Sequence, residues 1–399
     1  MTVLEGLKVV ELATYIAGPA TAGVMADWGA DVIKIESPAG DPHRRFFDNL
    51  TDGSHGNPVF DMDNRGKRSI VLDISKPEGR EAALRLAGQA DVFITNVRPA
   101  ALKRTGLDWE AMHGRYPQLI YASITGYGLQ GPEADKPGFD IAAFWARTGV
   151  AALTAPKGVE PFPVRTGMGD HTCSLATVSA ILAAVFERGR SGQGRLVETS
   201  LMRAGVYAIS TDMAIQLRLG RIASTRPREQ AVNPLANFFK TADGRWLCLV
   251  PRDGGADWPA IAQGLGVADL ALDPRFAKGR ERRTNGLELI RLLDETFATM
   301  NLTEAGARLD AADVVWSPVL TPAELAADPQ AEAAGCFVHM PDGAGGSYRA
   351  PAAPARFPGA DQGPRGPSPR LGQHTQEVLL ELGFEAAEIE TMRAAGAAA

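Results

Sequence analysis

The first half of the chain alternates short apolar runs with helical patterns. The apolar runs are rich in Val and Ile and are bounded by Gly, Asp or Pro, which is typical of β-strands. These predicted strands cover residues 8–12, 30–36, 69–74, 91–95 and 118–124. Helical spacing separates them at 19–29 and 77–90, and the second helix has a proline in its first turn. The alternation predicts an α/β fold with a largely parallel sheet covered on both faces.

A dinucleotide-binding Rossmann fold is the first hypothesis for such a sheet, and its first strand-to-helix turn provides a test. This turn reads ELATYIAGPATAG at 11–23 and lacks the G-x-G-x-x-G that lets a backbone approach a pyrophosphate closely. We therefore expect no nicotinamide or flavin bound by that route.

A longer helix is predicted after the motif RTGMGDHT at 165–172. Its apolar residues recur every three or four positions and give one continuous stripe. The stripe comprises Leu175, Val178, Ile181, Leu182, Val185 and Phe186. We expect the helix to end near Arg188, with Gly189 as a left-handed cap. The next loop, RGRSGQGR at 188–195, resembles a phosphate cradle, but it follows a helix and precedes a strand at 195–201, so we interpret it as a turn.

The second half has a different pattern. Residues 217–237 have linker character, and 237–251 predict a β-hairpin that turns at Asp243-Gly244. Helical patterns complete a small α+β domain and cover residues 257–266, 287–300 and 302–312. Residues 340–373 are dense in Pro, Gly and Ala. Because a compact domain rarely contains so long a structureless loop, we expect them to cross between domains or over a partner subunit.

Composition narrows the functional classes. With 45% hydrophobic and 22% charged residues the chain has a globular composition, and its net charge of −6 argues against general binding to nucleic acid or anionic membrane. It has no apolar run of about 20 residues and no signal-peptide pattern, so we expect a cytoplasmic protein. Cys173, Cys248 and Cys336 are far apart, which predicts neither a disulfide framework nor a metal site.

Two local basic clusters stand out against the negative net charge. Residues 63–69 supply Arg65, Lys67 and Arg68, and residues 96–104 supply Arg98, Lys103 and Arg104. Such clusters are either solvated basic faces or binding sites for an anionic ligand, and charge alone does not decide between them.

Asp170 has two interpretations. An Asp before an apolar-periodic run is a good helix N-cap, and spacing alone favours this structural role. Gly167 and Gly169 flank it, however, and glycine is used where the backbone approaches a ligand or adopts positive φ. A carboxylate that a helix N-terminus holds ionised is also a nucleophile for an activated acyl group. His171 is not expected to act with Asp170, because adjacent helical residues do not face one another, and Cys173 is expected to be structural.

Ordered motifs along nearly the whole chain resemble the class III CoA-transferase family. This group includes formyl-CoA transferase, carnitine CoA-transferase and acyl-CoA racemases. The motifs are LEGLKVVELATYIAGPATAGVMADWGADVIKIESPAGDPHR, NRGKRSIVLDISKPEGR, TNVRPAALKRTGLDWE, ITGYGLQGP, GMGDH, GQGRLVETSLM, DPRF and LGQHTQEVLLELGF. The branch that the chain resembles most transfers CoA between 2-hydroxy acids and enoyl acids, such as phenyllactate and cinnamate.

The resemblance implies a large Rossmann-like α/β domain built from both chain ends, a smaller α+β domain, and a homodimer of interlocked subunits. The expected segments are 1–216 for the first part of the large domain, 217–224 for a linker, 225–325 for the small domain, 326–373 for the linker crossing back, and 374–399 for the C-terminal helical part. The other implied partners are an acyl-CoA and a carboxylic acid, with CoA as a substrate and no permanently bound cofactor.

The family's catalytic aspartate falls on Asp170. By resemblance its carboxylate attacks the thioester of an acyl-CoA, and the reaction passes through aspartyl anhydride and aspartyl-CoA thioester intermediates. A glycine loop protects these intermediates in the family, and here it would be RDGGAD with Gly254 and Gly255.

The CoA contacts of the family carry over to residues after the predicted strands, where open α/β sheets bind ligands. They fall on Leu72, Asn96, Val97 and Arg104. The basic clusters add Arg98, Lys67 and Arg68 as partners of the nucleotide phosphates. Ser37 stands where formyl-CoA transferase has an arginine that stacks on CoA.

Two positions restrict the substrate. Ile16 replaces a substrate-facing glutamine, which disfavours a formyl or oxalate group. Phe139 precedes Asp140 where the racemases have a histidine, and a phenyl ring cannot move a proton. An acyl-CoA racemase is therefore the alternative hypothesis to a transferase acting on a medium-sized apolar or 2-hydroxy acid, and a non-catalytic nucleotide-binding module is the third. Phe139 is either a wall of the acyl pocket or a core residue.

Overall fold

The computed structural model describes residues 2–46, 57–162, 164–342 and 345–399. Its internal contacts divide the chain into two compact units. Unit 1 comprises residues 1–151, 162–222 and 333–399, and unit 2 comprises 152–161 and 223–332. The sequence analysis placed residues 152–161 in the large domain, whereas the contacts group them with unit 2. In that unit the Lys157 N–H donates to the Thr225 carbonyl at 3.0 Å.

Unit 1 contains a six-stranded sheet, all parallel, in the order β3-β2-β1-β4-β5-β6. The strands are β1 (Lys8–Leu12), β2 (Asp31–Glu36), β3 (Arg68–Val71), β4 (Val92–Thr95), β5 (Ile120–Thr125) and β6 (Leu196–Ser200). This is the strand order of the Rossmann fold, and it reverses direction between β1 and β4. The predicted α/β architecture and parallel sheet are confirmed.

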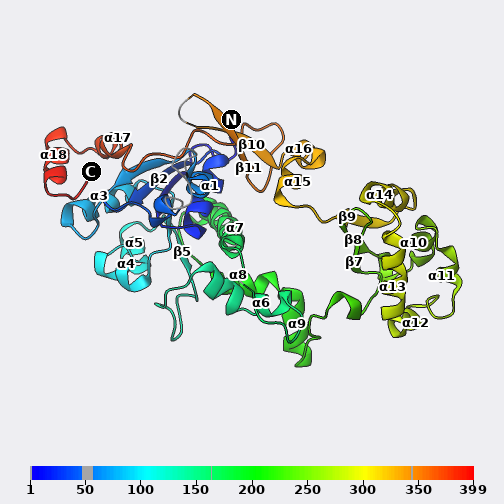
Figure 1. Ribbon diagram of the computed structural model, residues 1–399. Coiled ribbons are helices and arrows are strands. Elements are labelled where there is room, and N and C mark those ends of the chain that lie inside the picture. The colour runs from blue at the N-terminus through cyan, green and yellow to red at the C-terminus, as the bar shows by residue number, and fades with distance from the viewer. Residues whose placement is uncertain (1, 47–56, 163, 343–344) are drawn as a thin grey trace. The chain divides into compact units, whose positions relative to one another are not determined.

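Both faces of the sheet are covered (Figure 1). Side chains alternate along β1, so Val9 lies in one hydrophobic core and Val10 in the other. The first core receives α1 (Ala17–Asp27) and α7 (Met168–Ser191). The second receives α3 (Pro77–Gly88), α17 (Thr375–Glu381) and α18 (Ala386–Ala394). Burial on both faces explains why the strands read as nearly continuous apolar runs.

Shorter helices connect these elements or extend from them. In unit 1 they are η1 (Pro42–Arg45), α2 (Pro58–Asn64), α4 (Pro99–Thr105), α5 (Trp109–Arg115), the π-helix η2 (Asp140–Ala146), α8 (Leu201–Ala208) and α9 (Ser210–Leu219). The helices α6 (Val150–Thr154) and α16 (Pro329–Ala333) each span a boundary between the units in the sequence, and α15 (Pro322–Ala326) belongs to unit 2.

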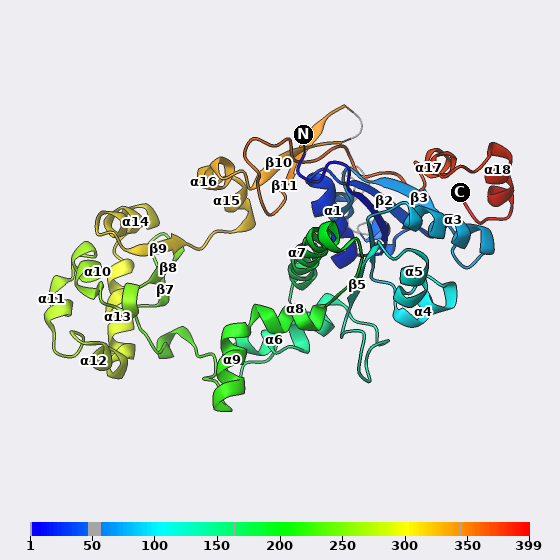
Figure 2. The ribbon, with the colours of Figure 1, turned by 180° about the vertical axis from the view of Figure 1, so that it is seen from behind.

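The C-terminal segment returns to β3 and lies beside α3, as Figure 2 shows from behind. The Asp73 N–H donates to the Ala397 carbonyl at 2.9 Å, and the Val71 N–H donates to Thr375 Oγ1 at 3.1 Å. Both ends of the chain therefore contribute to unit 1.

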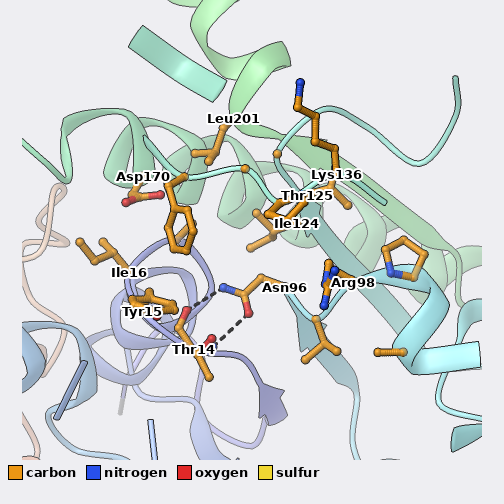
Figure 3. A pocket seen from close by; sticks show the side chains of 18 of the residues that line it. Thr14, Tyr15, Ile16, Asn96, Arg98, Ile124, Thr125, Lys136, Asp170 and Leu201 are labelled. Atoms are coloured by element: carbon orange, nitrogen blue, oxygen red, sulfur yellow. Dashed lines mark hydrogen bonds between the residues drawn. The ribbon is translucent and has the colours of Figure 1, made fainter. Parts of the chain in front are cut away.

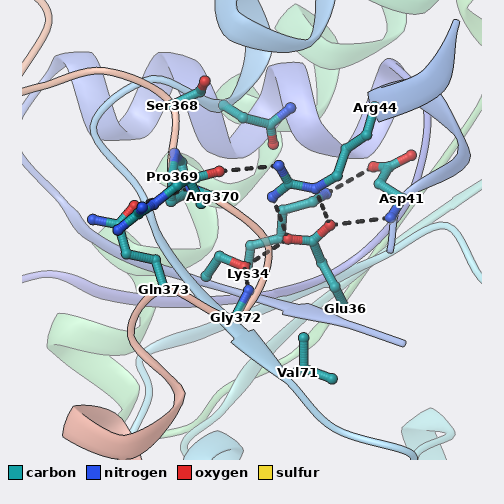
Figure 4. A network of polar contacts seen from close by, with 12 residues as sticks. Lys34, Glu36, Asp41, Arg44, Val71, Ser368, Pro369, Arg370, Gly372 and Gln373 are labelled. Carbon is teal, nitrogen blue, oxygen red and sulfur yellow. Dashed lines mark hydrogen bonds and ion pairs between the residues drawn. The ribbon is translucent and has the colours of Figure 1, made fainter. Parts of the chain in front are cut away.

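The Pro/Gly-rich segment is not structureless. The prediction for 340–373, of which 343 and 344 lie outside the described residues, is wrong for the hairpin of β10 (Phe337–Pro341) and β11 (Ser347–Pro351). Arg65 ties this hairpin to α1, because its guanidinium pairs with buried Asp27 and donates to the Pro351 carbonyl. Further along, Arg44 donates to the Pro369 carbonyl at 3.0 Å (Figure 4).

Unit 2 has an antiparallel sheet in the order β7-β8-β9, from β7 (Asn237–Lys240), β8 (Trp246–Val250) and β9 (Val315–Pro318). Its other elements are η3 (Arg228–Gln230), η4 (Arg252–Gly254), α10 (Trp258–Gly264), α11 (Ala268–Leu272), α12 (Gly279–Thr284), α13 (Gly286–Phe297) and α14 (Leu302–Ala311). The predicted hairpin is confirmed, with Gly244 at φ +79° in its turn. The short strand β9 was not predicted, because it contains a proline and lacks a buried face.

Candidate active site

A pocket of about 370 Å³ opens at the carboxyl ends of β1, β4 and β5, on both sides of the point where the strand order reverses (Figure 3). Its lining consists of Thr14, Tyr15, Ile16, Ala17, Asn96, Val97, Arg98, Pro99, Ala101, Ile124, Thr125, Gly126, Ala134, Lys136, Pro137, Gly138, Phe139, Asp170 and Leu201. The fold thus brings together segments that are far apart in sequence at the place where open α/β sheets bind ligands.

The two sides of the pocket differ in chemistry. Asp170 lies near Ile16 and Leu201, whereas Arg98 and Lys136 lie on the other side (Figure 3). Lys136 is exposed and pairs with Glu133 at 2.8 Å. An acidic group in an apolar part and two cations in a polar part suit a ligand with an acyl end and an anionic end.

The turn before Asp170 is held by a second buried aspartate. The Asp140 carboxylate accepts the N–H groups of Gly167 at 2.6 Å and Gly169 at 3.0 Å. Gly167 has φ +105°, and a Cβ at Gly169 would lie 2.2 Å from Asp140 Oδ1 and 2.3 Å from the Phe144 ring. Glycine is therefore required at these positions by the backbone of the turn and by its close contact with Asp140. Protein atoms already fill the space beside Gly169.

The structure corrects the prediction that Asp170 caps α7. Gly167 is the N-cap, and Asp170 is the third helical residue, without a side-chain capping bond. Asp170 is 9% exposed, and burial raises its pKa to about 7. The negative charges of Asp140 and Asp63 raise this pKa further, and His171 opposes them. Burial and repulsion thus oppose the ionised carboxylate that the helix terminus was expected to favour.

His171 and Cys173 have different surroundings. The His171 ring turns to Asp63 of α2, with Nε2 3.2 Å from Asp63 Oδ1, and this contact raises the pKa of His171. It makes no direct bond to Asp170 in the described structure, as expected for helical neighbours. Cys173 is fully buried and burial raises its thiol pKa to about 12, which confirms its structural interpretation.

Tyr15 also lines the pocket and was not predicted from the sequence. It has φ +64°, a conformation that is uncommon for a residue other than glycine. Its N–H donates to Asp41 Oδ1 at 3.1 Å, and its carbonyl lies 3.2 Å from His43 Nδ1. Its ring packs edge-to-face on Phe139 with centroids 5.3 Å apart. Phe139 is 56% exposed, so it lines the pocket and is not a core residue.

A buried network of charges lies behind this loop. Glu11 pairs with both Lys34 and Lys67 at 2.6 Å, and Lys34 also lies 3.0 Å from Asp41. Figure 4 shows Lys34 and Asp41 beside the Glu36–Arg44 pair. The predicted contact of Lys67 with CoA phosphate needs correction, because its ammonium is fully buried and bound to Glu11, Asn64 and the Pro19 carbonyl.

The other predicted CoA contacts fall into two groups. Asn96, Val97 and Arg98 line the pocket, and the Asn96 amide is fixed by two bonds to the Thr14 backbone at 2.7 and 3.0 Å (Figure 3). Arg104, on α4, is exposed outside the lining. Lys136 also lines the pocket but was missed, because its neighbours 131–137 show no strand or helix pattern.

Leu72, Ser37 and Arg68 are also outside the lining. Leu72 is buried in the core, and Ser37 is exposed after β2. Arg68 begins β3, at the amino end of the sheet, where it pairs with Asp31 and Glu381. The prediction for Arg68 therefore needs correction, since the pocket lies at the carboxyl ends of the strands.

Gly254 and Gly255 belong to unit 2. Both have positive φ, at +69° and +108°, and the Gly255 carbonyl accepts a bond from buried Arg282 at 3.1 Å. Their proposed protection of intermediates stays a prediction. Among the described residues, no group of three or more His, Cys, Asp and Glu side chains is arranged to hold a metal ion.

Comparison with known proteins identifies the family. The sequence profile of CoA-transferase family III matches residues 4–375. The chain belongs to CoA-transferase family III. It is 32% identical to (R)-2-hydroxy-4-methylpentanoate CoA-transferase of Clostridioides difficile, over 98% of both chains. It is 33% identical to cinnamoyl-CoA:phenyllactate CoA-transferase of Clostridium sporogenes, over 97% of this chain and 95% of the relative.

Solved structures agree with this assignment. A CAIB/BAIF family protein from Brucella suis superimposes with a TM-score of 0.83 at 33% identity, over 96% of this chain and 99% of that protein. The resemblance found in the motifs is confirmed, and the family III chain is an enzyme of the CoA-transferase type.

The helix α7 of this family III chain is the one described helix that is long and apolar enough to cross a membrane. The core helix of a soluble protein meets the same criteria, and α7 packs in the first core of unit 1 with Val178 and Ile181 buried. Its length and composition are therefore weak evidence for a membrane span.

Proposed function

We propose that the protein transfers CoA from an acyl-CoA to a medium-sized apolar or 2-hydroxy carboxylic acid, with Asp170 as the nucleophile. The observation that carries this proposal is the place of Asp170, whose buried carboxylate lines the pocket at the strand-order reversal. Ile16, Ile124 and Leu201 give the same pocket an apolar lining. The names of the two relatives support a 2-hydroxy acid substrate class.

The proposed chemistry consists of successive acyl exchanges. An ionised Asp170 oxygen attacks the thioester carbonyl and expels the CoA thiolate, which leaves a mixed anhydride. The thiolate then attacks the aspartyl carbonyl, releases the donor acid as its carboxylate and forms an aspartyl-CoA thioester. The acceptor carboxylate attacks this thioester to form a second anhydride, and the thiolate attacks its acyl carbonyl. This last step gives the new acyl-CoA and restores the Asp170 carboxylate.

Asp140 supports the transferase over the racemase alternative. A racemase needs a second acid or base, and Phe139 cannot serve as one. The neighbouring Asp140 is 1% exposed, and its carboxylate accepts hydrogen bonds from two backbone N–H groups of the turn. We therefore assign Asp140 a positioning role and propose no proton transfer through it.

For CoA we propose binding along Asn96, Val97 and Arg98, with Lys136 as a further contact. Arg98 and Lys136 lie on the same side of the pocket and suit the pyrophosphate (Figure 3). Arg104 extends the same basic surface on α4. Neither Ser37 nor Leu72 lines the pocket, and Leu72 is buried in the core, so this proposed CoA path does not use their side chains.

We also propose a homodimer. Large apolar side chains on α7, α8 and α9 are exposed in the single chain, which is typical of a surface covered by a partner. They are Leu175, Phe186, Val206, Tyr207, Ile215, Leu217 and Leu219.

The nucleophile is tested by trapping. The protein is incubated with an acyl-CoA and hydroxylamine, and peptides are analysed by mass spectrometry for a hydroxamate at Asp170. Wild type is expected to acquire it and Asp170→Asn is not. The absence of any adduct at Asp170, together with exchange of the α-proton in deuterated water, would contradict the proposal and favour the racemase. A panel of acids and CoA esters then identifies the donor and acceptor.

A further inference from the structure

The ring of His171 has a hydrogen-bond acceptor at each nitrogen. Nδ1 lies 2.8 Å from the Gly167 carbonyl oxygen, and Nε2 lies 3.2 Å from Asp63 Oδ1. A carbonyl oxygen and an ionised carboxylate only accept, so both bonds are satisfied when both ring nitrogens carry a proton. This geometry selects the imidazolium, which has a full positive charge one residue from Asp170.

Asp63 requires such a cation. It lies on α2, is 2% exposed, and its Oδ2 has no hydrogen-bond partner. A buried carboxylate is costly without a counter-charge. Lys67 attracts Asp63 electrostatically, but its ammonium is bonded to Glu11. His171 is therefore the cation that forms the ion pair with Asp63.

The charged groups around Asp170 come from three elements. Asp63 belongs to α2, Asp140 to η2 and His171 to α7. The two aspartates repel a charge on Asp170, whereas His171 attracts it. Of the described charged groups that act on Asp170, His171 is the one that favours the carboxylate. A protonated carboxylic acid is a poor nucleophile. The positive charge of His171 therefore increases the fraction of Asp170 that can attack a thioester.

We propose that His171, held in its charged form by Asp63, is a positioning residue for the reaction, and that its fixed positive charge favours the ionised form of Asp170. The proposal rests on the proposed role of Asp170 as the nucleophile. His171 itself touches no reacting atom. Asp63 is buried and its Oδ1 lies 3.2 Å from His171 Nε2, so its role is to hold the imidazolium in place and to keep it charged.

The test is the pH profile of kcat/KM. His171→Gln keeps a donor for Asp63 but removes the charge, and we expect the acid limb to move up by about one pH unit, with about 10-fold lower activity on that limb. The alkaline plateau stays within about 2-fold of wild type, because Asp170 is ionised there in both proteins. His171→Arg restores a cation and moves the limb back. His339→Gln, an exposed histidine on β10, is the matched control.

Other outcomes overturn the proposal. An equal loss at every pH in His171→Gln shows a structural role only, and an unchanged profile shows that the charge has no effect on Asp170. The hydroxylamine trap on His171→Gln at alkaline pH separates the two proposals. A hydroxamate at Asp170 there confirms the nucleophile whatever the acid limb does, whereas its absence in wild type removes the proposed function itself.

A measurement without turnover addresses the pair directly. The protein has six histidines, so ¹⁵N-histidine labelling gives a small set of signals to follow against pH. His171 is expected to titrate above the ordinary histidine range in wild type and lower in Asp63→Asn, which keeps an acceptor but loses the charge. A His171 titration unaffected by Asp63→Asn would contradict the pairing.

Discussion

Asp140 and Asp170 are buried carboxylates on two sides of one turn, and their hydrogen bonds separate their tasks. Asp140 accepts two backbone N–H groups, so its lone pairs are engaged in holding the turn. Burial raises the pKa of both carboxyls, but at Asp140 the two backbone N–H groups oppose this shift, whereas Asp170 makes no capping bond and its pKa rises to about 7. Environments that differ in this way commonly distinguish a structural carboxylate from a reactive one.

The raised pKa of Asp170 predicts a stability cost. Because the folded protein holds this proton up to about pH 7, while an unfolded aspartate loses it near 3.8, the free energy of unfolding falls as pH rises between these values. Asp170→Asn removes the cost, and we expect it to stabilise the protein at pH 8 by up to about 4 kcal/mol and at pH 4 by little. Urea unfolding at both pH values measures this, and equal effects at the two would contradict it.

The sequence predicts the apolar stripe of helix α7 well, but packing determines which of its residues are buried. The apolar stripe was predicted, but only part of it is in the core. Val178 and Ile181 are buried, whereas Leu175 and Phe186 are 42% and 70% exposed. The predicted cap at Gly189 is wrong, because the helix continues to Ser191 and the next residue, a glycine, adopts φ +68°.

The two ends of α7 provide a matched pair of glycine substitutions. At Gly169 a Cβ would overlap Asp140 and Phe144, so Gly169→Ala is expected to cost about 1–3 kcal/mol and most of the activity. At exposed Gly189 nothing lies within 4 Å of a Cβ, so Gly189→Ala is expected to stabilise by about 0.5–1 kcal/mol with unchanged kcat. Thermal unfolding and steady-state kinetics measure both. Similar effects at the two sites would exclude a special role for the turn.

Lys67 and Arg98 come from the two basic clusters but have different surroundings. Lys67 is part of the buried charge network with Glu11, whereas Arg98 lines the pocket. Lys67→Met leaves Glu11 with one of its two cations and is expected to cost about 3–5 kcal/mol of stability without raising the KM for acyl-CoA. Arg98→Ala is expected to leave stability unchanged and to raise that KM about 10-fold, if it binds phosphate. Denaturant unfolding and KM measurements on both variants distinguish a stabilising residue from a CoA-binding one. A raised KM in Lys67→Met alone would restore Lys67 as a CoA ligand.

At the scale of the whole molecule, the exposed apolar side chains on α7 and α8 predict self-association. Light scattering after gel filtration is expected to give twice the chain mass of 42.3 kDa. Phe186→Asp together with Tyr207→Asp places charges on side chains that are 70% and 80% exposed in the single chain, and we expect this variant to dissociate. Leu380→Asp, on α17, is the control. A wild-type monomer would contradict the proposed homodimer.

The sequence by itself determined the regular elements of the sheet and the family. Val- and Ile-rich runs and helical spacing are local, so β1, α3 and α7 were found within a few residues of their bounds. The motif around Asp170 was found in the same way. The hairpin β10–β11 was missed because glycine and proline around it hide the strand pattern, and its partner Arg65 is 286 positions from Pro351.

Only the tertiary structure decided the charge states and the roles that depend on them. Lys67 and Arg98 look alike in sequence, but folding buries one against Glu11 and leaves the other in the pocket. His171 acquires its acceptor from Asp63, 108 positions earlier. Hydrophobic periodicity is a property of neighbouring residues, whereas desolvation and Coulomb interactions depend on distances that exist only after the chain has folded.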